Sequence, residues 1–167
     1  MGLFGEKFTL LVVCKANITR SAYLHGYMKN YLKEHMPYAR KKVRILSAGV
    51  QARRGGSASQ VVQHVAKLNG FSLATHHSSP LTKKIVKAAD ALLVMEQCQK
   101  EAILERFPEA GDKTFRMMDY LWNDDHEDAH DIPDPTGQDT AEYKAFIEVA
   151  HAEVERIIRE LGREGII

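Results

Sequence analysis

A short apolar run near the start of the chain, followed at once by a helical pattern, sets the fold class. Residues Phe8 to Val13 read Phe-Thr-Leu-Leu-Val-Val, as expected of a strand buried on both faces. The run stops at Cys14, and apolar residues then recur at helical spacing from Ala22 to Leu32. A buried strand that leads directly into a helix is the building unit of a parallel sheet.

The same alternation continues along the chain. Further strands are predicted over 42–47, 90–95 and 113–118, with a helix over 97–107 between the last two. Because strands and helices alternate throughout, we expect one parallel sheet with its connections on both faces.

Capping residues predict where three other helices begin. Ser57 and Gln60 have the spacing of a capping box, and Ser79-Pro80 places proline in the first turn of the next helix. Asp139 and Glu142 have the same capping role before a long amphipathic helix that closes the sequence.

The fold expected is therefore α/β: a single domain over residues 1–167, with a core of about 8–163 and a four-stranded parallel sheet covered by helices on both faces. In such a sheet, ligands bind beyond the carboxyl ends of the strands. Cys14 lies at one of these ends, which directs attention to the loop that follows it.

Composition narrows the possible environments. A net charge of +1 gives no overall field that favours nucleic acid, and no apolar run approaches the roughly 18 residues that predict membrane insertion. The N-terminus begins like a myristoylation signal but has Glu6 where Ser or Thr is required. The two cysteines make no disulfide framework, so we expect a reducing, cytoplasmic location.

The loop of residues 14–21, Cys-Lys-Ala-Asn-Ile-Thr-Arg-Ser, has the chemistry of an oxyanion site. Amide groups at a helix N-terminus bind anions, and the same positive potential favours the thiolate of Cys14. Arg20 can grip two phosphate oxygens with its planar guanidinium, and Ser21 can hydrogen-bond the sulfur. The alternative is that Cys14 is simply a small buried residue at a strand end.

With this loop in place, the chain resembles the low-molecular-weight protein tyrosine phosphatases, whose fold is called phosphotyrosine phosphatase I-like. The loop resembles their C-x5-R-S phosphate loop, and Ile132-Pro133-Asp134-Pro135 resembles their late Asp-Pro pair. Ser47-Ala48-Gly49 and Val94-Met95-Glu96 resemble the ends of their second and third strands. The likeness extends over residues 8–160.

The resemblance implies an enzyme that hydrolyses protein phosphotyrosine and simple aryl phosphates through a phosphocysteine intermediate, without a metal or other cofactor. It implies Cys14 as nucleophile, Arg20 as phosphate clamp and Asp134 as general acid. Its partner would be a phosphotyrosine protein, with a bacterial tyrosine kinase as a candidate. The remaining residues that the resemblance assigns are Lys15, Ala16, Asn17, Ile18, Thr19 and Ser21 for substrate binding, and Ser47, His76 and Pro135 for support.

Two of these assignments carry structural expectations. Asn17 is expected to join Ser47 and His76 in a network that fixes the loop. Crowding by Asp131 and by a substrate dianion is expected to raise the pKa of Asp134 and keep part of it protonated. Without the resemblance, the segment around Asp134 would be interpreted as a turn ahead of a helix.

The loop departs from the family pattern at three positions. Lys15 replaces a small or apolar residue, and Ala16 replaces a glycine, which implies strain if that position has positive φ. Thr19 stands where many relatives have a second cysteine, so Cys14 would lack a protective disulfide.

The walls of the cleft also differ from the family. Thr136 and Arg53 occupy places where relatives often have aromatic residues, and Trp122 or Tyr120 is the candidate replacement, with packing at the loop base as the alternative for Trp122. Arg53 and the adjacent Arg54 suggest a preference for acidic phosphopeptides.

Other functions fit the sequence less well. His126-Glu127-Asp128-Ala129-His130 matches a zinc-protease motif, but it lies among acidic residues with no apolar face to bury it. An arsenate reductase needs two further cysteines, and only Cys98 remains. Related protein-arginine phosphatases carry Thr where Ile18 stands, which favours tyrosine. A non-catalytic phosphate-binding module on the same scaffold remains the main alternative.

Overall fold

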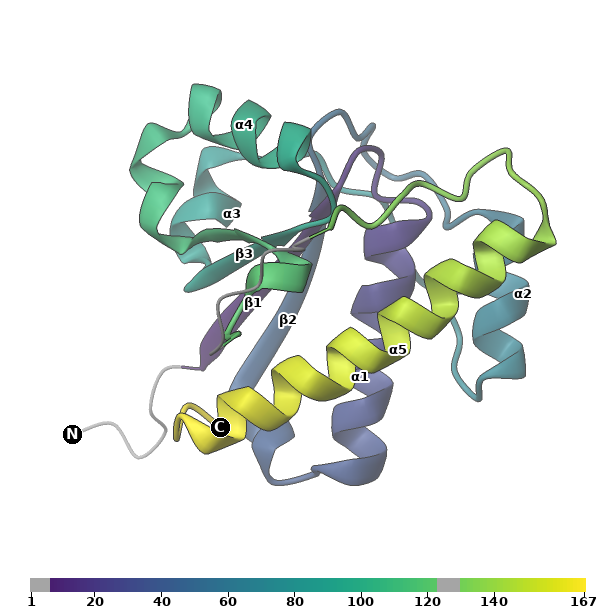
Figure 1. The fold of residues 1–167 in the computed structure, drawn as a ribbon, viewed down its shortest axis with the longest axis horizontal. Coiled ribbons are helices and arrows are strands. Elements are labelled where there is room, and N and C mark those ends of the chain that lie inside the picture. Colours follow the sequence, from purple (N-terminus) through teal and green to yellow (C-terminus); the bar gives the residue numbers. More distant parts are fainter. Residues whose placement is uncertain (1–6, 123–129) are drawn as a thin grey trace.

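One parallel sheet forms the centre of the protein. The computed structural model describes residues 7–122 and 130–167. Its strands have the order β2-β1-β3-β4 and are all parallel (Figure 1). They are β1 (Phe8–Cys14), β2 (Val43–Gly49), β3 (Ala91–Val94) and β4 (Thr114–Arg116). The predicted four-stranded parallel sheet is thus confirmed, with β1 inside the sheet and β2 at an edge.

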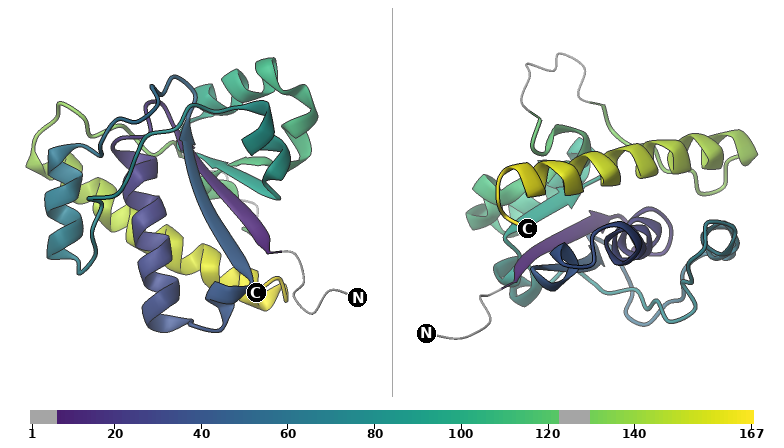
Figure 2. Two further views of the ribbon diagram at one scale, coloured as in Figure 1. Left: turned by 180° about the vertical axis from the view of Figure 1, so that it is seen from behind. Right: turned by 90° about the horizontal axis from the view of Figure 1, so that it is seen from below.

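Helices cover both faces of this sheet, as predicted (Figure 2). On one side lie α1 (Arg20–His35), α2 (Gln60–Leu68) and α5 (Thr140–Arg163). On the other side lie α3 (Lys83–Ala88) and α4 (Gln97–Arg106). Short 3-10 helices occupy Ala39–Lys41, Pro108–Lys113 and Met117–Asp119.

The apolar run of β1 supplies residues to two separate cores. Leu10 and Val12 pack with residues of α1 and α5, whereas Leu11 and Val13 pack with residues of α3 and α4. All four side chains are fully buried. Successive strand residues point to opposite faces, so a strand with helices on both sides must be apolar at almost every position.

Two of the predicted helix starts are wrong, and tertiary contacts explain both. Pro80 forms an isolated parallel bridge with Gly49, so α3 begins only after Thr82, whose side chain accepts a hydrogen bond from Ile85 N. At α2 the N-cap is Ser59 rather than Ser57, because Ser59 N donates to Ile18 O and holds the chain extended up to that residue.

The start of α5 is confirmed. Asp139 caps it by accepting hydrogen bonds from the amides of Ala141 and Glu142. The predicted last strand is shorter than expected, because residues 117–119 turn into a 3-10 helix instead. Arg156 of α5 fixes this turn by donating to Met117 O and Tyr120 O.

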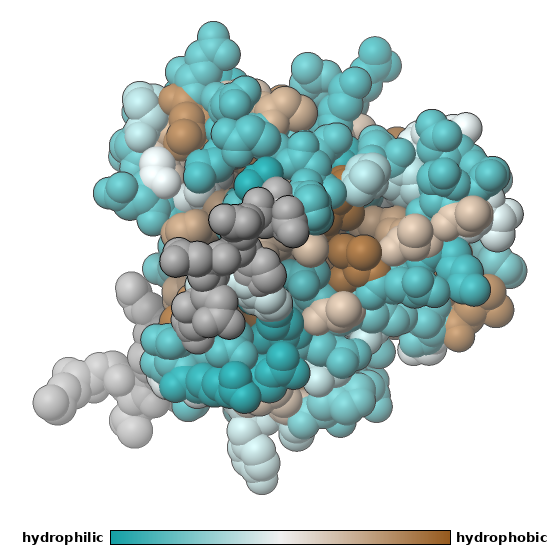
Figure 3. Space-filling view, viewed as in Figure 1, coloured by the Kyte–Doolittle hydropathy of each residue, from teal (hydrophilic) through white to brown (hydrophobic). Residues whose placement is uncertain are grey.

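The face of the protein seen in Figure 3 is mostly hydrophilic. On the face seen in Figure 3, hydrophobic side chains form small separate groups and not one continuous patch. Within the described ranges, the large hydrophobic side chains that are exposed are Tyr38, Val61, Leu68 and Trp122. No helix in this part of the chain is long and apolar enough to cross a membrane.

Candidate active site

The loop after β1 rests directly on the end of β2. Cys14 is paired with Gly49, its carbonyl oxygen accepts from Val50 N at 3.0 Å, and Lys15 O accepts from Gln51 N at 2.9 Å. A side-chain carbon at Gly49 would lie 2.6 Å from Lys15 O and 2.9 Å from the carbonyl carbon of Ala16. Only glycine lets the loop approach the sheet this closely, which explains physically why the Ser-Ala-Gly segment ends in glycine.

The Cys14 sulfur is buried among hydrogen-bond donors. Its Sγ lies 3.0 Å from Ser21 Oγ and 3.3 Å from Asn17 N. Ser21 Oγ already accepts a hydrogen bond from Asn17 Nδ2 at 2.8 Å, so its own hydrogen is available for the sulfur, with Ala48 O as a weaker acceptor at 3.5 Å. Donors aimed at a sulfur favour its thiolate, which is the nucleophilic form.

Asn17 gives the loop its shape. Its φ of 57° is in the left-handed region, which asparagine tolerates better than most residues. Ser79 N donates to its Oδ1 at 2.9 Å, and His76 Nε2 lies 2.7 Å from its carbonyl oxygen. A carbonyl oxygen only accepts, so this nitrogen of His76 carries the hydrogen. The predicted bond between Asn17 and His76 is therefore present.

One expectation about the loop is wrong, and the condition attached to the expectation for Ala16 is not met. Ser47 Oγ lies 3.4 Å from His25 Nδ1 and makes no bond with Asn17, whose polar atoms are taken up by Ser21, His76 and Ser79. Ala16 does not have positive φ, since among the described non-glycine residues only Asn17 and Leu121 do. The strained position is one residue later than expected, and an asparagine occupies it.

Arg20 is held by two carboxylates and a carbonyl. Its side chain is 1% exposed; Nη1 lies 2.9 Å from Glu96 Oε2 and 2.7 Å from Ile132 O, and Nη2 lies 3.3 Å from Asp134 Oδ2. Its Nε is buried and has no hydrogen-bond partner in the described part of the chain. A buried donor without a partner is costly, so this atom is suited to an incoming oxyanion.

The sequence identifies Glu96 only as part of a segment that resembles the family, and not as a site residue. Its place at the carboxyl end of a buried strand was the available signal, because polar side chains at that edge of a parallel sheet face the ligand crevice.

Asp134 is ionised more readily than predicted. Partial burial acts to raise its pKa, but hydrogen bonding to Thr136 and the positive charges of Arg20 and Lys15 outweigh burial and lower the pKa below its usual value. Asp131, which was expected to crowd it, instead accepts from Gln97 N at 2.9 Å and faces Arg116 at 3.5 Å. The expected rise in the pKa of Asp134 through crowding by Asp131 is therefore wrong.

The loop that carries Asp134 is tied to the phosphate loop. Thr136 Oγ1 donates to Thr19 Oγ1 at 3.2 Å, and Ile132 N donates to Met95 O at 2.8 Å at the end of β3. Pro135, the residue after Asp134, is buried. Thr19 stands where many relatives have a second cysteine, and its hydroxyl group joins the two loops.

The remaining predicted residues lie around this centre or away from it. Lys15, Arg53 and Arg54 are exposed. Tyr120 is buried and packs against Phe115 with ring centroids 5.0 Å apart, so it is not a wall of the cleft. The ring of Trp122 lies 4.5 Å from the guanidinium carbon of Arg156 on α5. This contact fits the alternative role given for Trp122, packing at the base of the loop. The protease-like motif at 126–130 falls outside the described residues except for His130.

A phosphate-type loop after the first strand, with a buried cysteine, an arginine and an aspartate on a neighbouring loop, is the arrangement of a phosphatase site. The chain matches the family described as low molecular weight phosphotyrosine protein phosphatase over residues 9–166, and it belongs to that family.

Individual relatives also match this chain over most of its length. The chain is 33% identical over 157 residues to a protein-arginine-phosphatase of Geobacillus stearothermophilus, covering 94% of this chain and 98% of the relative. It is 35% identical to the low molecular weight protein-tyrosine-phosphatase Ptp of Acinetobacter johnsonii, covering 79% and 82%. The solved phosphatase of T. tengcongensis superimposes with a TM-score of 0.81 at 27% identity, covering 93% and 100%.

Proposed function

We propose that this protein hydrolyses phosphotyrosine in proteins, and simple aryl phosphates, with Cys14 as nucleophile, Arg20 as phosphate clamp and Asp134 as general acid. The observation that carries the proposal is the arrangement around the loop. A buried sulfur surrounded by donors is followed, at the start of the next helix, by an arginine that contacts the candidate acid.

In the first step, the phosphate dianion enters the loop and engages the backbone amides and Arg20 Nε. The Cys14 thiolate attacks phosphorus, the bond from phosphorus to the phenolic oxygen breaks, and Asp134 gives its proton to that oxygen. Asp134 must first take up a proton. The dianion favours this, because it competes for Arg20 and places negative charge beside the carboxyl group.

In the second step, Asp134 accepts a proton from water, and the water oxygen attacks the phosphocysteine. The bond between sulfur and phosphorus breaks, inorganic phosphate forms, and the thiolate leaves. The hydroxyl of Ser21, at 3.0 Å, donates to the departing sulfur. The other loop residues proposed to bind substrate in this cycle are Lys15, Ala16, Ile18 and Thr19.

Turnover of para-nitrophenyl phosphate and of a phosphotyrosine peptide tests these roles. Cys14→Ser is expected to abolish turnover, and Asp134→Ala is expected to lower kcat by about 10²- to 10⁴-fold while largely sparing phosphate binding. Cys98→Ser is the matched control, since Cys98 is exposed on α4, and it should keep full activity. A Cys14→Ser protein with undiminished turnover would refute the mechanism and favour a non-catalytic binding module.

Phosphoarginine is the second candidate substrate, because a protein-arginine-phosphatase is among the relatives that match almost the whole chain. Ile18 lies in the phosphate loop, and the family resemblance associates Thr at this position with arginine. We therefore expect kcat/KM to be higher for a phosphotyrosine peptide than for the matched phosphoarginine peptide, and Ile18→Thr to reduce the difference. The opposite order in the unmodified protein would assign arginine as the substrate.

The proposal includes the cellular location of the protein and its partner. Cys14 and Cys98 are both free thiols, which suits a reducing cytoplasm. The partner proposed is a phosphotyrosine protein, with an autophosphorylating bacterial tyrosine kinase as the candidate. Loss of phosphotyrosine from such a kinase on incubation with the unmodified protein, but not with Cys14→Ser, is the expected result.

A further inference from the structure

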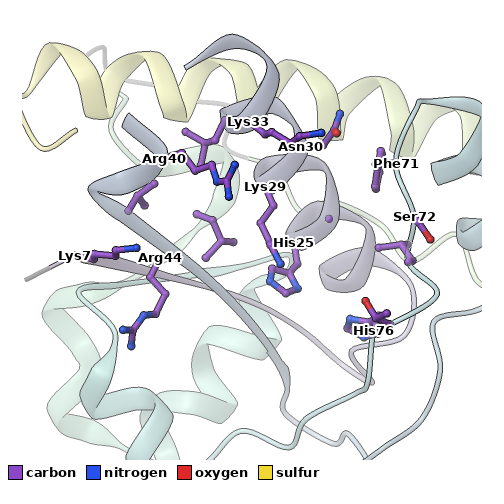
Figure 4. Close-up of a pocket in the computed structure, with 16 residues that line it drawn as sticks. Lys7, His25, Lys29, Asn30, Lys33, Arg40, Arg44, Phe71, Ser72 and His76 are labelled. Atoms are coloured by element: carbon purple, nitrogen blue, oxygen red, sulfur yellow. The ribbon is translucent and has the colours of Figure 1, made fainter. Parts of the chain in front are cut away.

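A cavity of about 580 Å³ lies behind the phosphate loop, between α1, β2 and the segment 71–76 (Figure 4). None of residues 14–21 lines it, so it is separate from the active site. Its volume is within the range of small-molecule sites. Nothing in the proposed reaction uses it.

The walls of this cavity are strongly basic. Its charged lining residues are Lys7, Lys29, Lys33, Arg40 and Arg44, and no Asp or Glu lines it in the described part of the chain. Lys33 is paired with Glu34 at 3.1 Å, but Lys29, Arg40 and Arg44 form no ion pair with any described residue. Like charges gathered without counter-charges repel one another, and a bound anion would relieve this repulsion.

Protection of the sheet edge does not account for these charges. An edge strand such as β2 often carries a cation that opposes pairing with another chain, and Arg44 fits that role. Lys29 and Lys33, however, come from α1 and face the same cavity. Cations supplied from two different elements around one cavity are the arrangement expected of an anion site.

The cavity reaches the phosphate loop through one histidine. His76 lines its inner end and donates to Asn17 O at 2.7 Å. Asn17 in turn donates from its backbone to Cys14 Sγ and from its side chain to Ser21 Oγ. A second histidine, His25, lies beside His76 with ring centroids 6.4 Å apart.

His25 lies in the wall of the cavity beside Lys29 and His76. Its pKa is lowered to about 4, first by burial and then by the charges of Lys29 and His76, against the hydrogen bond with the backbone of Ile45. Burial also lowers the pKa of His76. An anion bound among these cations would counter their field and favour the protonated form of His76, which would make its hydrogen bond to the loop charge-assisted.

We propose that this cavity binds a small oligophosphate anion, and that its occupancy is transmitted to the phosphate loop through His76 and Asn17. Phosphoryl oxygens match the many Lys and Arg donors, and several linked phosphates match their spread around one cavity. Phe71 and Leu73 line the same cavity and give a nucleotide base an apolar surface, so inorganic triphosphate and a nucleoside triphosphate are the two sources to compare.

Calorimetric titration tests binding independently of the proposed reaction. The probes are inorganic triphosphate and a nucleoside triphosphate, with the active site saturated by orthovanadate. We expect one binding site per chain, weakened about tenfold or more in the double variant Lys29→Gln, Arg44→Gln. The matched control, Lys83→Gln with Lys84→Gln, makes the same change of charge on α3 and should bind as the unmodified protein does.

Each result of this titration has a definite meaning. Tighter binding of the nucleotide than of inorganic triphosphate would identify a nucleotide site, and equal binding would identify a site for the oligophosphate alone. Loss of binding in the presence of vanadate, or equal weakening in both double variants, would overturn the proposal. So would tighter binding of an acidic peptide such as hexaglutamate than of either triphosphate.

The coupling to the loop rests on the proposed phosphatase activity and is measured separately. At saturating para-nitrophenyl phosphate, triphosphate should change kcat by about fivefold or more in the unmodified protein and in the α3 control. The Lys29→Gln, Arg44→Gln variant should keep its basal kcat and lose this response. Purely competitive inhibition with unchanged kcat would overturn the coupling, whereas failure of the proposed function would show as an absence of basal turnover.

Discussion

Arg20 and Glu96 form an ion pair at the carboxyl edge of the sheet, with 2.9 Å between Nη1 and Oε2. The arginine is almost completely buried, whereas the glutamate is 27% exposed. Since Nη2 contacts Asp134, the guanidinium is fixed on one side by Glu96, just after β3, and on the other by the loop of the candidate acid. Its orientation is therefore set by contacts within the protein.

Replacing Glu96 should loosen this arrangement. We expect Glu96→Gln to lower kcat/KM by about tenfold, mainly through KM, because Arg20 loses the charge that orients it. The free energy of unfolding should fall by about 1–3 kcal/mol, less than for a fully buried pair. Steady-state kinetics and urea unfolding check both values. Glu105→Gln, at an exposed position of α4, the helix that Glu96 caps, should change neither, and equal effects of the two variants would argue against the orienting role.

Gly49→Ala tests the contact between β2 and the phosphate loop. The added carbon would lie 2.6 Å from Lys15 O, so the loop backbone must shift. We expect a loss of about 1–3 kcal/mol in stability and of about 10²-fold in kcat/KM. Gly111→Ala is the control, because no atom lies within 4 Å of the added carbon there. Full activity in Gly49→Ala would show that the loop is not held by this contact.

Asn17→Asp separates the shape of the loop from its hydrogen bonding. The variant keeps an oxygen for Ser79 N but removes the donor to Ser21 Oγ, so the Ser21 hydrogen should turn to the new carboxylate and away from Cys14. We expect slower alkylation of Cys14 by iodoacetamide at neutral pH, by about tenfold. Asn69→Asp, at the end of α2, should alkylate at the normal rate. Unchanged reactivity in Asn17→Asp would remove Ser21 as the stabiliser of the thiolate.

The lowered pKa of Asp134 predicts a pH-dependent contribution to stability. A carboxyl group whose pKa is lower in the folded chain than in the unfolded chain stabilises the fold above its unfolded value, near pH 4. This contribution is lost as the pH falls through the folded value. Because the side chain is 39% exposed, we expect less than about 1 kcal/mol. Urea unfolding of the protein and of Asp134→Asn should differ most at pH 6 and converge toward pH 2; a difference that grows on acidification would contradict the sign.

The sequence predicted the sheet because β1 is apolar at nearly every position, which only burial on both faces explains. The family resemblance, carried by the C-x5-R-S loop and the Asp-Pro pair, assigned Cys14, Arg20 and Asp134, and the structure shows Arg20 in contact with Asp134. The sequence did not predict contacts between segments that are far apart along the chain. Ser47 contacts His25 of α1, Pro80 pairs with Gly49, and Glu96 meets Arg20. Each depends on how distant segments pack, and local propensity does not encode this.

The hydrogen bond between Thr136 and Thr19 has a consequence for the timing of the reaction. It holds the loop of the candidate acid against the phosphate loop, so we expect that this acid does not need to be delivered by closure of a mobile flap. Solvent viscosity should then have little influence on the chemical step, and catalysis would be limited by bond breaking or product escape and not by a large rearrangement of the chain.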